Sequence, residues 1–276
     1  MPLSSPLTSA TVWCARPVPI EAGTAWLSPK ESAKASAFRQ DADRRRFVTG
    51  RALVRAAVGE RLGTAPASVH VRVGPRDGPS PGRPFVDGGP SFSIAHAGRW
   101  VLVAVVDGAG GWARTEVSIG VDVESDVPAR DHLADLLDAL PPQERPAQGW
   151  AAESFTRSWV RREAVLKAVG TGLRAPRDDL VLARANDDAS IVHSGGVLPA
   201  PDRLALRDLE LQGDYLAAVA ICARPSTRPS TGTPGVTVPR PRPAPARLTF
   251  SDVRLADGHE LLARNGIDDL EDLGPL

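Results

Sequence analysis

Two carboxylates with the spacing needed to bind a divalent cation lie in the segment 119–124. Asp122 and Glu124 are two positions apart, and apolar residues alternate with them. This period of two predicts a strand with isoleucine and valine on one face and both carboxylates on the other. At about 3.3 Å per residue the carboxylates stand about 7 Å apart and repel each other unless a cation lies between them. Mg²⁺ suits such oxygen ligands, and two solvated carboxylates on an edge strand are the alternative.

A third carboxylate comes from a predicted helix that ends at Gly170. At about 100° per residue, Glu163 and Lys167 fall within the apolar stripe of this helix and not opposite it. A charge in that place needs an opposite charge or a metal ion to offset its desolvation. Glu163 beside Asp122 and Glu124 would complete a metal site that leaves positions for phosphate oxygens and water. A surface Glu-Lys pair worth about 0.3–0.5 kcal/mol is the alternative.

Three basic features are candidates for binding an anion. His96 ends the strand predicted from Ser91, Arg83 lies in a loop between a glycine and a proline, and Arg46 closes a run of three arginines in a predicted helix. Each has a plain structural explanation as well: a hydrogen-bonded histidine, a solvated loop charge and a solvated helix face. These residues by themselves leave both explanations open.

The elements that must position these side chains follow from local signals. The tetrapeptide 28–31, Ser-Pro-Lys-Glu, predicts a helix start with a capping box and proline in the first turn. A second helix is predicted from about Asp43 to Gly63, and residues 74–90, rich in glycine and proline, predict loops. The remaining predictions are a hairpin over 91–106, strands at 119–124 and 215–222, and helices at 130–140 and 154–169.

Composition excludes several classes of protein. The chain has 276 residues, 33 basic and 33 acidic, so its formal net charge is zero and bulk binding to nucleic acid or a membrane surface is not expected. No apolar run approaches the roughly 18 residues of a membrane helix, and no secretory signal is seen. The two cysteines form no CxxC pair, which predicts reduced thiols in a cytoplasmic protein.

The chain is predicted to divide at three places. Residues 1–117 and 118–224 would form two halves of one folded unit, and residues 225–247, rich in proline, threonine and arginine, a solvated linker. Residues 248–276 would form a short helical appendix, with helices over about 257–265 and 268–273.

Five segments, taken in order, resemble the 4′-phosphopantetheinyl transferase superfamily, in particular the surfactin-synthetase-activating type. The resemblance runs from about Leu27 to Ala223. The segments that carry it are Phe38 with Asp43 to Arg46 and Gly50-Arg51, Gly82-Arg83-Pro84, Phe92 to Trp100, Ile119 to Glu124, and Trp159 to Lys167 followed by Gly170 to Leu173.

This resemblance implies an α/β (α+β) fold of two similar halves related by a pseudo-twofold, each a small sheet packed with helices, with the ligand cleft between them. It implies transfer of the 4′-phosphopantetheine group from coenzyme A to a serine of an apo acyl or peptidyl carrier protein, with release of 3′,5′-ADP. Because one chain supplies both sides of the cleft, a monomer is expected.

The site residues implied by the resemblance are the following. Asp122, Glu124 and Glu163 would hold Mg²⁺, or Mn²⁺ in its place, against the diphosphate. Ala95, His96, Lys34 and Arg46 would lie at the 3′-phosphate, and Gly82, Arg83 and Pro84 at the adenine. Lys167 would lie against the diphosphate and stabilise the transferring phosphoryl group, and Glu163 would act as the base, directly or through a metal-bound water.

The sequence departs from the family pattern at three places. Arg162 replaces a frequent lysine, which keeps the charge for anion binding but changes its geometry; Ala95 replaces a serine and removes one hydroxyl donor; residues 225–276 have no counterpart. A non-catalytic homologue that binds coenzyme A or a carrier protein is therefore the competing hypothesis. A magnesium-dependent nucleotide phosphohydrolase ranks last, because no GxxxxGK[ST] loop is present.

Overall fold

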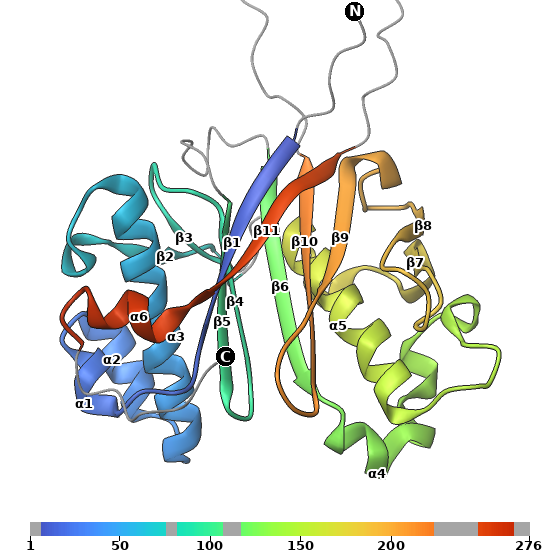
Figure 1. Ribbon diagram of the computed structural model, residues 1–276, viewed down its shortest axis with the longest axis horizontal. Coiled ribbons are helices and arrows are strands. Elements are labelled where there is room, and N and C mark those ends of the chain that lie inside the picture. Colours follow the sequence, from blue (N-terminus) through green and yellow to red (C-terminus); the bar gives the residue numbers. More distant parts are fainter. Residues whose placement is uncertain (1–6, 76–81, 107–116, 224–247, 268–276) are drawn as a thin grey trace, which may run out of the picture.

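The computed structural model describes residues 7–75, 82–106, 117–223 and 248–267, which form two neighbouring sheets with helices on both outer sides (Figure 1). The first sheet has the strand order β11-β1-β5-β4 and the second the order β6-β10-β9. Their strands are β1 (Leu7–Ala15), β4 (Phe92–Ala97), β5 (Trp100–Val106), β6 (Val117–Ser125), β9 (Leu204–Leu209), β10 (Tyr215–Ala223) and β11 (Thr249–Asp257). The mixed α/β class predicted from the sequence is confirmed.

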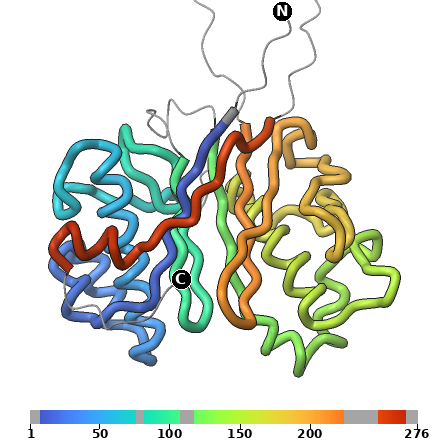
Figure 2. The backbone as a smooth tube through the Cα atoms, viewed as in Figure 1, coloured from blue at the N-terminus to red at the C-terminus, as the bar shows by residue number. Residues whose placement is uncertain are grey.

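Two long helices cover the outer faces of these sheets, α3 (Asp41–Leu62) on the first and α5 (Ala152–Val169) on the second (Figure 2). The shorter helices and the two small hairpins are α1 (Ile20–Thr24), α2 (Pro29–Ser36), α4 (Val127–Leu136), α6 (Gly258–Ala263), β2 (Val71–Val73) with β3 (Pro84–Val86), and β7 (Leu180–Leu182) with β8 (Ile191–Ser194). None of the helices in the described ranges combines the length and the apolar character required to cross a bilayer.

Apolar side chains fill three layers between these elements. One layer joins α3 to the first sheet through residues such as Leu53 and Val103, and another joins α5 to the second sheet through residues such as Val165 and Ala220. The middle layer lies between the two sheets, where Val121 of β6 is fully buried. Each sheet is therefore apolar on both faces, which is why β5 reads as an unbroken apolar run.

Local signals start and end the helices where the sequence predicts. The Ser28 side chain accepts from the Glu31 amide at the start of α2, and the Glu31 carboxylate accepts from the Ser28 amide at 2.9 Å. Gly63 ends α3 with φ of 63° and Gly170 ends α5 with φ of 92°, a conformation that favours glycine. Helix α4 begins three residues before its predicted start, and β3 forms inside the segment predicted as loops.

The C-terminal segment differs from the predicted appendix. Helix α6 is present, but β11 precedes it and pairs with β1 in parallel from Leu7–Thr249 to Cys14–Asp257. Leu261 and Leu262 are fully buried in the layer under α3. Residues 248–267 are therefore part of the first sheet and its core. The predicted linker and the helix predicted over 268–273 lie outside the described residues.

Candidate active site

Helix α5 crosses β6 in close contact at Gly120. A Cβ atom on Gly120 would lie 2.1 Å from the Ala164 carbonyl oxygen and 2.4 Å from the Ala168 nitrogen, so only glycine fits. The face of β6 that carries Gly120 also carries Asp122 and Glu124, while the intervening side chains enter the layer between the sheets. The two carboxylates therefore face the helix that carries Glu163 and Lys167.

Asp122 and Lys167 form the central ion pair of this site. The Lys167 ammonium lies 2.5 Å from Oδ1 of Asp122 and donates a hydrogen bond of 3.2 Å to the Val121 carbonyl. The other carboxylate oxygen, Oδ2 of Asp122, and Oε1 of Glu163 are buried without a hydrogen-bond partner in the structure. Buried carboxylate oxygens are costly unless something binds them, so both atoms are available to a cationic ligand.

Burial raises the pKa values of three neighbouring carboxyl groups, and in two of them a nearby carboxylate charge adds to the rise. Burial raises the pKa of Glu124 to about 7, and the charges of Asp122 and Glu163 add to that rise while Lys167 opposes it. Burial and then the Asp122 charge raise the pKa of Glu163. Burial raises the pKa of Asp122 as well, against the attraction of Lys167. Asp122, Glu124 and Glu163, called the carboxylate trio below, thus form one electrostatic unit in which a cation would be stabilised.

In the described ranges no three His, Cys, Asp or Glu side chains converge closely enough to hold a metal ion. The cation bound to Asp122 in this arrangement is the Lys167 ammonium. The unpartnered oxygens of Asp122 and Glu163 fit a hard divalent ion in type and burial, but the trio must draw closer together to coordinate one.

A cationic cavity of about 330 Å³ adjoins Lys167 and receives residues from α2, α3, α5, strand β4 of the first sheet and the segment 82–84. Among the described residues, five cationic side chains and no carboxylate line it. The lining residues are Lys34, Arg46, Phe47, Gly50, Arg51, Gly82, Arg83, Pro84, Phe92, Ser93, Ile94, His96, Leu166, Lys167, Gly170 and Gly172. A partly enclosed hollow of one charge sign favours an anion with several charges.

Most of the predicted ligand residues meet at this cationic cavity. Lys34, Arg46, His96, Lys167 and the segment 82–84 all line it, although they come from five separate stretches of sequence. Part of the His96 ring is exposed at the rim, yet desolvation lowers its pKa, and the charges of Arg46 and Lys167 lower it further. A neutral imidazole at this place can donate one hydrogen bond without adding charge.

Ala95 does not line the cationic cavity. It is 4% exposed and packs in the layer between the sheets, on the opposite face of β4 from His96. The alternation of side chains along a strand explains this placement, because neighbours in sequence point to opposite faces.

Arg162 also lies away from the cationic cavity. Its side chain is buried and donates to Oε1 of Glu144 at 2.8 Å and to the Leu180 carbonyl at 2.6 Å. The Glu144 side chain has no exposed surface. The anion-binding role expected of Arg162 from the sequence is therefore wrong: in the structure Arg162 is the buried partner of Glu144.

Arg51 is a lining residue to which the sequence analysis gives no role. Its guanidinium lies 5.2 Å from the centre of the Phe47 ring, and the Lys34 ammonium lies 5.1 Å from the same ring. Arg51 follows Phe47 by four positions, so both share one face of α3. That spacing is the sequence signal that could have found it.

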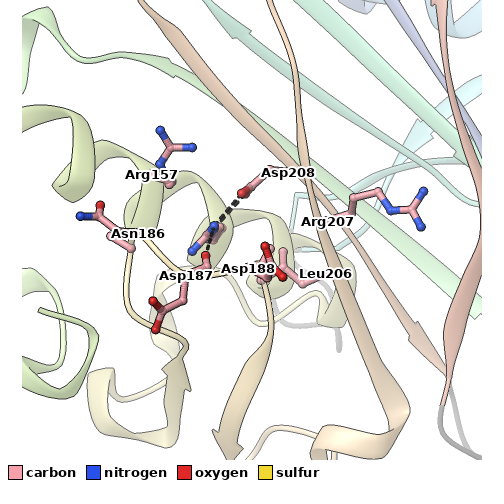
Figure 3. Close-up of a pocket in the computed structure, with 10 residues that line it drawn as sticks. Arg157, Asn186, Asp187, Asp188, Leu206, Arg207 and Asp208 are labelled. Carbon is pink, nitrogen blue, oxygen red and sulfur yellow. Dashed lines mark hydrogen bonds and ion pairs between the residues drawn. The ribbon is translucent and has the colours of Figure 1, made fainter. Parts of the chain in front are cut away.

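Other cavities lie outside the cationic cavity. One of them, of about 640 Å³, surrounds Arg161, whose guanidinium donates to both carboxylate oxygens of Asp208 at 2.8 and 2.6 Å and to the Asp187 carbonyl. Figure 3 shows Asp187, Asp208 and other residues that line this cavity. Those bonds give Arg161 a structural role, and no member of the carboxylate trio lines that cavity. An apolar cavity of about 270 Å³ between α4 and α5 reaches Glu124, and Trp159 forms part of its wall.

Comparison with known proteins identifies similar sequences. Residues 118–220 match the sequence model of the 4′-phosphopantetheinyl transferase superfamily, and this stretch contains the whole carboxylate trio and Lys167. The chain is 32% identical over 160 residues to the 4′-phosphopantetheinyl transferase HetI of Nostoc sp., covering 54% of this chain and 62% of that relative. It is 26% identical over 177 residues to a 4′-phosphopantetheinyl transferase of Bacillus subtilis, covering 60% of this chain and 69% of that protein.

The chain therefore spans a little less than two thirds of the length of the first of these relatives. The resemblance to the 4′-phosphopantetheinyl transferase superfamily inferred from the sequence is confirmed over residues 118–220.

Proposed function

We propose that this protein is an enzyme that transfers the 4′-phosphopantetheine group of coenzyme A to a serine of an apo acyl or peptidyl carrier protein and releases 3′,5′-ADP. One observation supports the proposal most strongly: Lys167 lines the cationic cavity and also forms an ion pair with Asp122 of the carboxylate trio. Coenzyme A is an anion at both its 3′-phosphate and its diphosphate, and only the diphosphate must reach the reaction centre. A cation-lined cavity that ends at acidic groups matches that distribution of charge.

The cationic cavity would hold the 3′-phospho-ADP part of coenzyme A. Lys34, Arg46 and His96 are proposed for the 3′-phosphate, because all three line the cavity and carry donors, and the Arg46 charge acts on His96. Arg46 is held by Asp43 at 2.5 Å and by the Gly98 carbonyl at 2.9 Å, which orients its guanidinium before a ligand arrives. Gly82 and Pro84 are proposed to border the adenine.

The carboxylate trio is proposed to hold Mg²⁺, or Mn²⁺ in its place. Its two unpartnered buried oxygens and the raised pKa values of its three carboxyl groups support this assignment. When bound, the ion would neutralise charge on the diphosphate and on the leaving 3′,5′-ADP.

Two side chains of this site have roles in the transfer itself. Glu163, whose raised pKa suits a general base, takes the proton of the carrier serine. Lys167 donates to an oxygen of the transferring phosphoryl group and stabilises its charge. That role requires the ammonium to share its hydrogens between Asp122 and the phosphate, which its half-buried position beside the cationic cavity allows.

A monomer in the cytoplasm is proposed for two reasons. Both sides of the cationic cavity come from one chain, so a second copy is not required to complete it. Cys14 is a buried thiol outside any disulfide, as suits a reducing compartment.

Transfer is tested by incubating the protein with coenzyme A, Mg²⁺ and a panel of apo carrier proteins and weighing the carriers. A modified carrier gains about 340 Da, the mass of the transferred group in this phosphoryl-transfer chemistry. No gain on any carrier, with coenzyme A binding retained, would favour the non-catalytic binding homologue. Release of phosphate or phosphopantetheine without a carrier would favour the phosphohydrolase.

The Glu163→Gln variant separates binding from chemistry in the same assay. It keeps the size of the side chain and removes the base, so coenzyme A should still bind while transfer stops. Transfer at the normal rate would show that Glu163 is neither the base nor an essential metal ligand.

A further inference from the structure

One edge of β6 is buried, and no strand in the described part of the chain forms a ladder with it. Strand β6 pairs with β10 on one side, and in the described sheets its other side has no ladder partner, although β4 lies beside it. The backbone amides and carbonyls of Ile119 and Val121 point to that side, and both residues are fully buried. Buried backbone groups need hydrogen-bond partners, so the bonds of this edge must go to side chains.

Four side chains supply those bonds. Ser91 accepts from the Ile119 amide at 3.2 Å, and Ser93 accepts from the Val121 amide at 3.1 Å. Arg83 donates to the Ile119 carbonyl at 2.7 Å. Lys167 donates to the Val121 carbonyl at 3.2 Å. Three of the four therefore come from the part of the chain before β6, which fixes β6 against the first sheet.

Arg83 binds the end of α5 as well. Its NH1 group donates to the Lys167 carbonyl at 2.8 Å and to the Ala168 carbonyl at 3.3 Å. These carbonyls belong to the last turn of the helix, where carbonyl groups have no intrahelical N–H partner and a positive charge is favourable. One guanidinium thus joins the strand that carries Asp122 to the helix turn that carries Lys167.

The hydrogens of the two terminal nitrogens of Arg83 are all engaged with protein acceptors. Its NH2 group donates to Ser91 Oγ at 3.3 Å in addition to the Ile119 carbonyl, and its NH1 group has the two helix carbonyls. A phosphate could bind those nitrogens only by displacing one of these bonds. The planar fork of arginine suits several fixed acceptors at once, which a lysine ammonium cannot match.

We propose that Arg83 is a positioning residue: through the edge of β6 and the end of α5 it holds Asp122 and Lys167 in the register of their 2.5 Å ion pair. This inference rests on the proposed transfer for its catalytic consequence. The Arg83 side chain would then not contact the nucleotide. Only the backbone of the segment 82–84 would border the adenine.

The test compares Arg83→Lys and Arg83→Met with Arg99→Met as a matched control. Arg99 also joins the two sheets, since it donates to the Gln212 carbonyl at 3.2 Å and lies over the Tyr215 ring; these partners lie outside β6 and α5. Both Arg83 variants should lower kcat about tenfold or more, because small misplacements at a reaction centre are costly, and change KM for coenzyme A less than about threefold. Arg99→Met should keep kcat and KM.

The outcome that overturns the proposal is a raised KM for coenzyme A at normal kcat in Arg83→Met that Arg83→Lys restores. That pattern would mark a direct charge contact with the nucleotide. If Arg83→Met fails to fold, Arg83→Lys alone still separates the two patterns, because it retains the charge.

A second readout does not depend on transfer. Hydrogen exchange measured without ligand should become faster in peptides covering 118–123 and 164–170 of the Arg83 variants, and not in Arg99→Met. Unchanged exchange in both peptides would overturn the positioning role even if the enzyme is active. Faster exchange in a protein that transfers nothing to any carrier would instead count against the proposed function alone.

Discussion

The Lys167 ammonium touches Asp122 at 2.5 Å while the main chain of Lys167 is held by Arg83, so both ends of this residue are fixed within the junction of the two sheets. The two side chains of this ion pair differ in solvent exposure. The Asp122 side chain is 7% exposed and that of Lys167 is 31% exposed. The lysine therefore reaches from a buried carboxylate toward the cationic cavity, where it can meet a second anion.

Replacing Lys167 with methionine should lower the transfer rate about 100-fold, since it removes a donor at the phosphoryl group. It should also leave Asp122 buried without its cation, and the pKa of Asp122 should rise because Lys167 now lowers it. The stability loss should therefore be larger at about pH 8 than at about pH 5, where the unpaired carboxyl can be protonated. Urea unfolding at the two pH values measures this difference. An equal loss at both would contradict the ion pair.

Stability of the ligand-free protein should depend on pH through Glu124. Its pKa of about 7 lies above the ordinary 4.5, so the fold favours the protonated form. That contribution to stability is complete below pH 4.5 and is lost as pH rises through about 7; Asp122 and Glu163 act in the same direction. Thermal midpoints across this range should fall less in Glu124→Gln than in the natural sequence. Parallel slopes for the two proteins would refute the shift.

Magnesium should bind more tightly as pH rises through about 7, because the ion needs deprotonated carboxylates and displaces their protons. The thermal midpoint should therefore increase on adding Mg²⁺ at about pH 8 and change little at about pH 5. Asp122→Asn should abolish the increase. An increase of equal size in Asp122→Asn would place the ion elsewhere.

Arg162 and Glu144 should matter for stability and not for coenzyme A. Replacing Arg162 with methionine leaves the fully buried Glu144 carboxylate without its cation, which costs about 3–5 kcal/mol. KM for coenzyme A should stay unchanged, since Arg162 does not line the cationic cavity. Chemical unfolding and steady-state kinetics on the same preparation test both halves of this expectation. A large rise in KM with little change in stability would restore Arg162 to the anion site.

The C-terminal segment should contribute to the stability of the first sheet. Leu262 is fully buried under α3, so Leu262→Ala should cost about 2–5 kcal/mol. Leu255, which is 38% exposed on β11, provides the matched control, and Leu255→Ala should stay within about 0.5 kcal/mol of the natural sequence. Equal effects of the two substitutions in urea unfolding would argue against β11 and α6 as parts of the core.

Several features of this protein follow from short stretches of sequence. The start of α2 follows from Ser28 and Glu31, and the ends of α3 and α5 follow from Gly63 and Gly170, because capping and left-handed backbone involve only neighbouring residues. The alternation in β6 predicts which face carries Asp122 and Glu124. The resemblance to the family predicts seven of the sixteen described residues that line the cationic cavity: Lys34, Arg46, Gly82, Arg83, Pro84, His96 and Lys167.

The tertiary structure alone decided which partners these side chains have. Arg162 meets Glu144, 18 positions away, and Arg83 meets the carbonyls of Ile119 and Lys167, 36 and 84 positions away. β11 pairs with β1 from the other end of the chain. Such contacts depend on how distant segments pack, because an arginine side chain can donate to many different acceptors and its own sequence neighbours do not determine which one. Sequence patterns therefore predict what a residue can bind, and packing selects what it does bind.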